Sequence, residues 1–145
     1  MILYFDASAI VKRYVAEPGS EEVQALLAKA EVVGTGIVSR VEVAATLAQA
    51  VRMRALSQKE AAVALDYFSA EWIRFNRLQP TEQVVAQAST LAWEQGLRGY
   101  DAVHLACALF WKEMLGKSVC MVTYDRQLWE ASRRAGLEVF PGERP

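Results

Sequence analysis

The stretch ILYFDASAIVK (Ile2–Lys12) begins with a short apolar run and continues into a pattern of helical period. A continuous apolar run of this kind is typical of a strand that is buried on both faces. We therefore predict a strand over Ile2–Phe5 and a helix over Ala7–Val15, with Asp6 at the junction between them.

The same alternation continues along the chain. Short apolar runs predict strands at Val32–Thr35, Arg74–Leu78, Val119–Thr123 and Leu137–Phe140, and 3.6-residue periodicity predicts helices at Ser20–Ala30, Ser39–Ala55, Ser57–Ile73, Thr81–Gln95, Tyr100–Leu115 and Arg126–Ala135. Ser20 is expected to be the N-cap of its helix, and Gly136 the C-cap of the last helix. The alternation indicates an α/β domain whose parallel sheet is covered on both faces. In such sheets ligands bind beyond the carboxyl ends of the strands.

Length and composition indicate one ordinary globular domain. The chain has 145 residues, which suits a single domain over 1–145, and 53% of its residues are hydrophobic. No segment approaches the roughly 20 apolar residues of a membrane helix, and the start shows no secretory signal. Cys107 and Cys120 are too few for a disulfide framework, which favours a reducing, cytoplasmic compartment. The net charge of −1 means that any basic surface for nucleic acid must be local.

Carboxylates are the candidate functional groups. Of the four aspartates, Asp6, Asp101 and Asp125 lie at strand ends or helix starts. Taken singly, each is equally well explained as a helix N-cap. Taken together, several carboxylates at one sheet edge repel each other, and a bound cation offsets that repulsion.

A glutamate joins this set by its place in the predicted fold. Ser39-Arg-Val-Glu42 and Ser57-Gln-Lys-Glu60 both match the capping-box pattern S-x-x-E. Glu42 begins a helix that follows a strand, so it can face the carboxyl edge, whereas Glu60 begins a helix after a helix–helix turn. We therefore interpret Glu60 as a cap and Glu42 as a site residue.

Four carboxylates suit a hard cation such as Mg²⁺ or Mn²⁺, and such ions serve phosphoryl transfer and phosphodiester hydrolysis. The sequence disfavours other catalytic sets. It contains one histidine, which argues against a histidine-pair ribonuclease. It also lacks the P-loop and nucleophile-elbow motifs.

Four segments resemble those of PIN-domain proteins, in the same order along the chain. They are the D-x-S-x-x-x-K of Asp6–Lys12, the S-x-x-E of Ser39–Glu42, the D-A-x-H-x-A of Asp101–Ala106 and the T-x-D…L of Thr123–Leu128. Within that family, the sequence is most similar to the VapC-type toxins of bacteria and archaea.

The resemblance implies a three-layer α/β/α sandwich with a central parallel sheet, Mg²⁺- or Mn²⁺-dependent cleavage of RNA, an antitoxin partner and a homodimer. It makes Asp6 and Asp101 the principal metal ligands, Asp125 a further ligand, and Glu42 an acid that binds the metal directly or through water. Ser8 and Thr123 match hydroxyls that hydrogen-bond the acids. Unlike some members, this chain has no second acid beside Asp125, so a second metal site is in doubt.

Several cations lie within about a turn of these acids and are candidates for RNA-phosphate contacts, with a solvated charged surface as the equal alternative. They are Lys12, Arg13, Arg40, Arg98 and Arg126. His104 is interpreted as a packed histidine with one satisfied nitrogen rather than a phosphate contact. Most of the four tryptophans are interpreted as core or interface residues rather than stacking platforms for bases, and the apolar Leu65–Ile73 as a dimer or antitoxin surface.

The leading functional hypothesis is an endoribonuclease toxin. The alternatives are a PIN-like module that binds RNA or protein without cutting, and a metal-dependent phosphatase acting on small molecules. A binding module has no need of a repulsive acidic cluster. A phosphatase of the haloacid-dehalogenase type would have a second acid at the position of Ser8.

Overall fold

The centre of the protein is a sheet of five parallel strands. A computed structural model describes residues 1–145. The strands are β1 (Ile2–Phe5), β2 (Val32–Gly36), β3 (Asn76–Leu78), β4 (Cys120–Val122) and β5 (Glu138–Phe140), in the spatial order β3-β2-β1-β4-β5. β1 pairs with β2 on one side and with β4 on the other, so the strand order reverses beside β1. In a parallel sheet this reversal opens a crevice at the carboxyl ends of the central strands.

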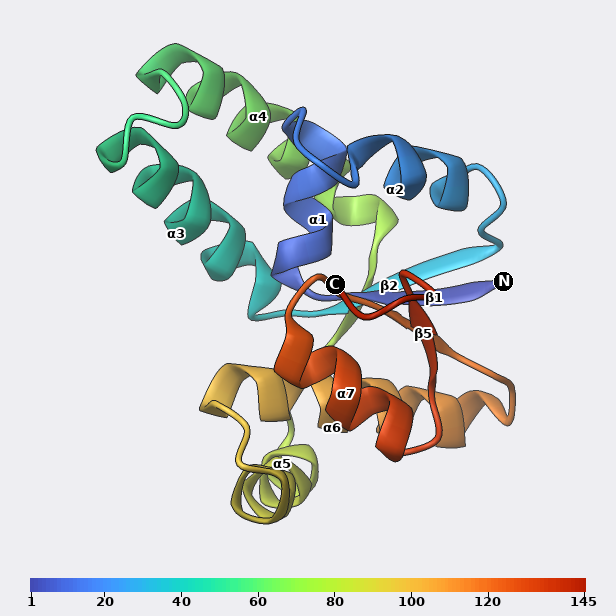
Figure 1. The fold of residues 1–145 in the computed structure, drawn as a ribbon. Helices are drawn as coiled ribbons and strands as arrows, with labels where there is room; N and C mark the ends of the chain where they lie inside the picture. The colour runs from blue at the N-terminus through green and yellow to red at the C-terminus, as the bar shows by residue number, and fades with distance from the viewer.

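Helices cover both faces of this sheet (Figure 1). One layer holds α1 (Ala7–Tyr14), α2 (Ser20–Leu27), α3 (Ser39–Arg52), α4 (Gln58–Glu71) and the short 3₁₀ helix η1 (Trp72–Arg74). The other layer holds α5 (Glu82–Gln95), α6 (Gly99–Leu115) and α7 (Arg126–Arg134). The three-layer α/β/α sandwich with a central parallel sheet is therefore confirmed.

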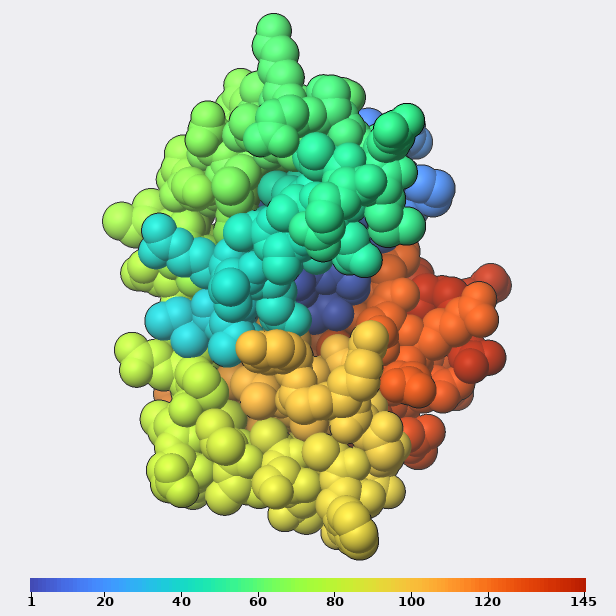
Figure 2. Space-filling model, turned by 90° about the vertical axis from the view of Figure 1, so that its left-hand side faces the viewer, coloured from blue at the N-terminus to red at the C-terminus, as the bar shows by residue number.

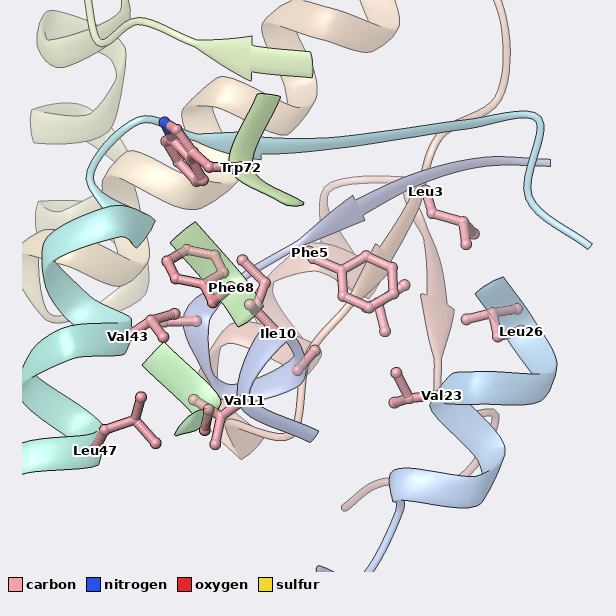
Figure 3. Packing of buried hydrophobic residues seen from close by; sticks show 14 of the residues in the cluster. Leu3, Phe5, Ile10, Val11, Val23, Leu26, Val43, Leu47, Phe68 and Trp72 are labelled. Atoms are coloured by element: carbon pink, nitrogen blue, oxygen red, sulfur yellow. The ribbon is translucent and has the colours of Figure 1, made fainter. Parts of the chain in front are cut away.

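The two layers have separate hydrophobic cores because side chains along a strand alternate between the faces of the sheet. Leu3 and Phe5 of β1 pack against α1 to α4 in one cluster, and Figure 3 shows them beside residues of those helices. Tyr4, between them, points to the opposite face and packs against α6 in the other cluster. This places the Tyr4 hydroxyl among apolar side chains, where it needs a hydrogen-bond partner.

Most predicted elements are present, and the differences lie chiefly at their ends. Ser20 is not an N-cap: Gly19 takes that place in the left-handed region, with φ 94°, and the Ser20 hydroxyl donates instead to the Val15 carbonyl. The predicted helices that began at Ser20, Ser39 and Ser57 each end two or three residues early, and η1 replaces the last turn of the third. α7 ends at Arg134, one residue earlier than expected, so its C-cap is Ala135 and Gly136 is the residue that follows, with φ 88°.

The burial of two sets of apolar side chains bears on their interpretation. Trp72, Trp111 and Trp129 are buried as expected, but Trp93 on α5 is 90% exposed. The apolar character of Leu65–Ile73 is explained chiefly by burial within this chain, because Phe68 and Trp72 belong to the core and stack edge to face. Its exposed large side chains are those of Tyr67 and Ile73.

Two further observations concern the whole chain. No helix combines the length and the apolar composition needed to cross a lipid bilayer. Cys107 and Cys120 are both free and buried.

Gly34 of β2 offers a test of the packing between the sheet and α6. A Cβ at this position would lie 2.6 Å from the ring of the buried Trp111. Overpacking of this kind costs about 1–3 kcal/mol, so Gly34→Ala should lower the free energy of unfolding by that amount in urea titrations. Gly142→Ala is the control, because no atom lies within 4 Å of its added Cβ. Equal unfolding midpoints for the two variants would contradict the packing described here.

Candidate active site

Asp6 lies at the junction where β1 passes into α1, and both of its carboxylate oxygens are hydrogen-bonded. Oδ1 accepts from the Ser8 hydroxyl at 2.7 Å and from the Ala9 N–H at 3.1 Å, and Oδ2 accepts from the Thr123 hydroxyl at 2.7 Å. The Ala9 bond makes Asp6 the N-cap of α1. The cap interpretation is therefore correct for this residue, the hydrogen bonds expected from Ser8 and Thr123 are present, and a role of Asp6 in a metal site stays a prediction.

Burial shapes the electrostatics of Asp6. The residue is buried at the carboxyl edge of the sheet, and the loss of solvation raises the pKa of its carboxyl group. The hydrogen bonds from Ser8, Thr123 and Ala9 lower that pKa but do not outweigh the burial. An ionised Asp6 is therefore less stable here than in water, unless a cation is nearby.

Asp101 and Asp125 come from different helices and are joined by one arginine. Arg98 Nε donates to Asp101 Oδ2 at 3.0 Å, and another nitrogen of the same guanidinium donates to Asp125 Oδ2. Burial, together with the charge of Asp125, raises the pKa of Asp101. Arg98 therefore acts as an internal cation between two acids that would otherwise repel.

These two aspartates differ in their local roles. Asp125 is the N-cap of α7, because its Oδ1 accepts from the Leu128 N–H at 2.9 Å. Asp101 lies inside the first turn of α6, whose N-cap is Arg98, so the cap interpretation is wrong for Asp101. Its carboxylate is buried and bonds the side chain of Arg98, three residues earlier.

The two S-x-x-E segments have different structures despite matching patterns. Ser57 and Glu60 form a reciprocal capping box, each side chain bonding the other's backbone N–H at 3.0 Å. Ser39 forms none, because it is the first residue of α3 and its hydroxyl contacts that of Thr35 at 2.7 Å. The carboxylate of Glu42 therefore forms no capping bond and instead contacts His104 of α6.

Glu42 accepts a hydrogen bond from His104 Nε2 at 2.6 Å. The other ring nitrogen of His104 is also bonded, to the hydroxyl of Tyr4 at 2.8 Å. His104 is buried as predicted, but the expectation of one satisfied nitrogen was wrong. Sequence reasoning missed Tyr4, although a phenol within an otherwise apolar strand is a signal that a buried polar partner is needed.

Of the five predicted phosphate-binding cations, only Arg98 contacts the acids. Lys12 bonds Glu17 and the Pro18 carbonyl, and Arg126 bonds the Pro145 carbonyl. Arg13 forms an ion pair with Glu71 and a hydrogen bond with Gln24. Arg40 is exposed. Three of these side chains are therefore bound to partners away from the acids, and the contacts of the five cations with RNA phosphates stay a prediction.

A groove leads away from the acids between α5 and α6. It has a volume of about 680 Å³ and is lined by Glu42, Asp101 and Arg98 together with apolar side chains such as Val85 and Tyr100. Figure 2 shows a hollow beside this groove, with atoms from the start of the chain at its floor between α3, α6 and α7. Of the four acids, Glu42 and Asp101 line the groove itself.

The donor set fits a divalent cation by its chemistry, since carboxylate oxygens are the ligands that Mg²⁺ and Mn²⁺ prefer. As the side chains stand, no three acids or histidines are close enough together to hold one ion. Asp101 and Asp125 are drawn to Arg98, whose side chain is 69% exposed and free to leave. We therefore expect these two acids to bind an ion only after Arg98 has released them.

Comparison with known proteins agrees with this geometry. The family model described as the PIN domain matches residues 3–133. The chain belongs to the PIN-domain family. This PIN domain is 34% identical over 142 residues to Ribonuclease VapC45 of Mycobacterium tuberculosis, covering 98% of this chain and 96% of that protein. It is 32% identical over 130 residues to Ribonuclease VapC3 of Pyrobaculum aerophilum, covering 90% and 94%.

Solved structures show the same fold. The PIN domain superposes on a chain of a toxin–antitoxin complex from Klebsiella pneumoniae with a TM-score of 0.65 and 16% sequence identity, covering 100% of both chains.

The raised pKa of Asp101 gives a test of its role. A raised pKa in the folded protein means that ionisation destabilises the fold, so the metal-free protein should lose stability as the pH rises through that pKa. Asp101→Asn removes this charge, while Arg98 keeps Asp125 as a partner. Like charges a few ångströms apart cost on the order of 1 kcal/mol. In chelator at neutral pH, the variant should therefore melt no lower than the parent, and up to roughly 2–4 °C higher.

Added Mg²⁺ distinguishes the metal-site and structural roles in the same melting experiment. A ligand that binds only the folded state raises the melting temperature, so Mg²⁺ should stabilise the parent and Asp101→Asn far less. A variant that melts lower in chelator and responds to Mg²⁺ like the parent would show that Asp101 is structural.

Proposed function

We propose that this PIN domain is a metal-dependent endoribonuclease and the toxin of a type II toxin–antitoxin pair. The observation that carries the proposal is the set of four acids at one accessible edge. Asp6 and Asp101 are buried there at an electrostatic cost. Its relatives named Ribonuclease VapC, matched over nearly the full chain, support RNA as the substrate.

The chemistry follows from what each side chain can hold. Asp6, Asp101 and Asp125 would hold Mg²⁺ or Mn²⁺, which supplies neutralisation of a phosphate and a water of lowered pKa. Ser8 and Thr123 keep the Asp6 carboxylate in one orientation. Glu42 lines the groove together with Asp101 and would orient that water, because one of its carboxylate oxygens has no hydrogen-bond partner.

Arg98 has two positions in this proposal. In the metal-free protein it neutralises Asp101 and Asp125. When it releases them, its guanidinium lies at the rim of the groove, where a bidentate contact to an RNA phosphate is available. Arg98 is thus the one predicted cation that the proposal retains as an RNA contact.

We further propose an antitoxin partner, a homodimer and a cytoplasmic location. The superposition on a chain of a toxin–antitoxin complex supports the partner. The reduced Cys107 and Cys120 suit a reducing compartment. The dimer rests on the family and on exposed apolar side chains such as Tyr67 and Ile73.

RNA cleavage by the purified protein is the direct test. We expect assorted RNAs to be cut in Mg²⁺ or Mn²⁺ and left intact in excess chelator, as followed on denaturing gels. Glu42→Gln should reduce the rate by roughly a hundredfold or more, since it removes a positioned carboxylate. Glu60→Gln is the matched control: it keeps a capping side chain on the surface and should change the rate by less than about twofold.

Two outcomes would overturn the ribonuclease proposal. Equal cleavage in chelator would exclude the metal-dependent reaction. Equal rates in Glu42→Gln and Glu60→Gln, purified in the same way as the parent, would point to a contaminating nuclease or to a module that does not itself cut.

The homodimer is tested by light scattering. Without antitoxin and at micromolar concentration, the protein should elute with twice the 16.1 kDa mass of the chain. A monomer under these conditions would contradict the proposed dimer and leave the cleavage proposal untouched.

A further inference from the structure

A buried chain of hydrogen bonds joins three elements and ends at Glu42. Tyr4 on β1 bonds His104 Nδ1 at 2.8 Å, and His104 Nε2 on α6 bonds Glu42 Oε1 on α3 at 2.6 Å. Tyr4 and His104 are 0% and 1% exposed. The Glu42 side chain is 22% exposed, so the chain of hydrogen bonds reaches solvent at this carboxylate.

The positions of the hydrogens follow from the partners. An ionised Glu42 can only accept, so His104 Nε2 must carry the hydrogen of that bond. In a neutral imidazole that carries its hydrogen on Nε2, Nδ1 has none and can only accept, so the Tyr4 hydroxyl donates to it. His104 is thus the tautomer with its hydrogen on Nε2, and it points that hydrogen at Glu42.

The packing around the two rings holds this arrangement in place. A Cβ at Gly36, the last residue of β2, would lie 2.8 Å from the Tyr4 hydroxyl oxygen and 3.5 Å from His104 Nδ1. The backbone of β2 therefore lies directly against the hydrogen bond. The two rings meet edge to face, with their centroids 5.8 Å apart. Close packing of two fully buried rings restrains both of them in this arrangement.

His104 and Asp101 lie three residues apart on α6, so they point from neighbouring positions on one side of the helix. The same helix therefore carries one acid and the donor that holds a second acid from α3. Since Glu42 has three flexible side-chain torsions and no capping bond, the bond from His104 is what fixes its direction.

We propose that His104 is a positioning residue, which orients Glu42 through Nε2 and leaves the second carboxylate oxygen of Glu42 for a divalent ion or its water. Tyr4 sets the tautomer of His104 from the other side. This inference rests on the proposed function for its consequence in catalysis, but the hydrogen-bond chain itself is testable by metal binding alone.

Mn²⁺ calorimetry with two substitutions at one position tests the proposal. His104→Gln places an amide N–H where Nε2 stands and keeps a donor for Glu42, whereas His104→Asn ends one atom short and loses it. Partners that orient metal ligands typically contribute 10–100-fold to affinity. We expect His104→Asn to weaken Mn²⁺ binding by roughly that factor, and His104→Gln to retain most of the parent's affinity.

A double-mutant cycle separates positioning from general damage to the core. In a Glu42→Ala background, His104→Asn should weaken Mn²⁺ binding no further, because the carboxylate that it orients is gone. An equal loss in both backgrounds, or equal losses for Asn and Gln, would overturn the proposal. If His104→Asn does not fold, Tyr4→Phe takes its place in the cycle with Glu42→Ala, because this substitution removes a single oxygen.

The single histidine of the chain allows a direct spectroscopic reading. Nitrogen-15 NMR of the imidazole at neutral pH should show a hydrogen on Nε2 in the parent, and a changed Nδ1 signal in Tyr4→Phe. A hydrogen found on Nδ1 would overturn the assignment. If the double-mutant cycle couples His104 to Glu42 but the protein does not cleave RNA, this inference stands and the ribonuclease proposal fails. If the protein cleaves RNA but the cycle shows no coupling, the ribonuclease proposal stands and this inference fails.

Discussion

Negative charge gathered at the end of three neighbouring elements is the constraint on which the rest of the structure depends. Asp6, Asp101 and Asp125 are brought to the carboxyl edge of the sheet, where burial removes the water that would otherwise screen them. The surrounding groups offset this cost in two ways. Neutral hydroxyls donate to Asp6, and one guanidinium binds both other aspartates.

The two ways differ in whether the charge of the carboxylate is cancelled. Hydrogen bonds from Ser8 and Thr123 orient Asp6 without cancelling its charge. They therefore leave its attraction for a cation intact. Arg98 does cancel charge, but it is a long, exposed side chain whose place a divalent ion can take. The site thus combines one acid held rigidly with two acids held by an exchangeable partner.

The fold also explains why helix ends and the site coincide. Asp6 and Asp125 each follow a strand and cap the next helix, so the carboxylate that starts the helix also faces the carboxyl edge. One oxygen of each accepts from the helix N–H, and the other faces its neighbours across the site. A structural and a functional role are compatible here because a carboxylate has two oxygens.

The sequence by itself determined the order of elements, the parallel sheet with helices on both faces and the acids beyond its carboxyl edge. These follow from local periodicity and from the strand–helix junctions, where Asp6 and Asp125 are fixed within a few residues. Local pattern was insufficient for Glu42, because S-x-x-E forms a capping box at Ser57 and none at Ser39.

Only the tertiary structure decided which distant groups meet. The bond from His104 to Glu42 joins residues that are 62 positions apart, and that from Tyr4 to His104 joins residues 100 positions apart. The tertiary structure also places Arg13 beside Glu71 and Arg98 beside the acids, although both arginines lie near a site aspartate in the sequence. Periodicity reports which face of an element is buried, but the partner of a polar side chain depends on how whole helices and strands pack together.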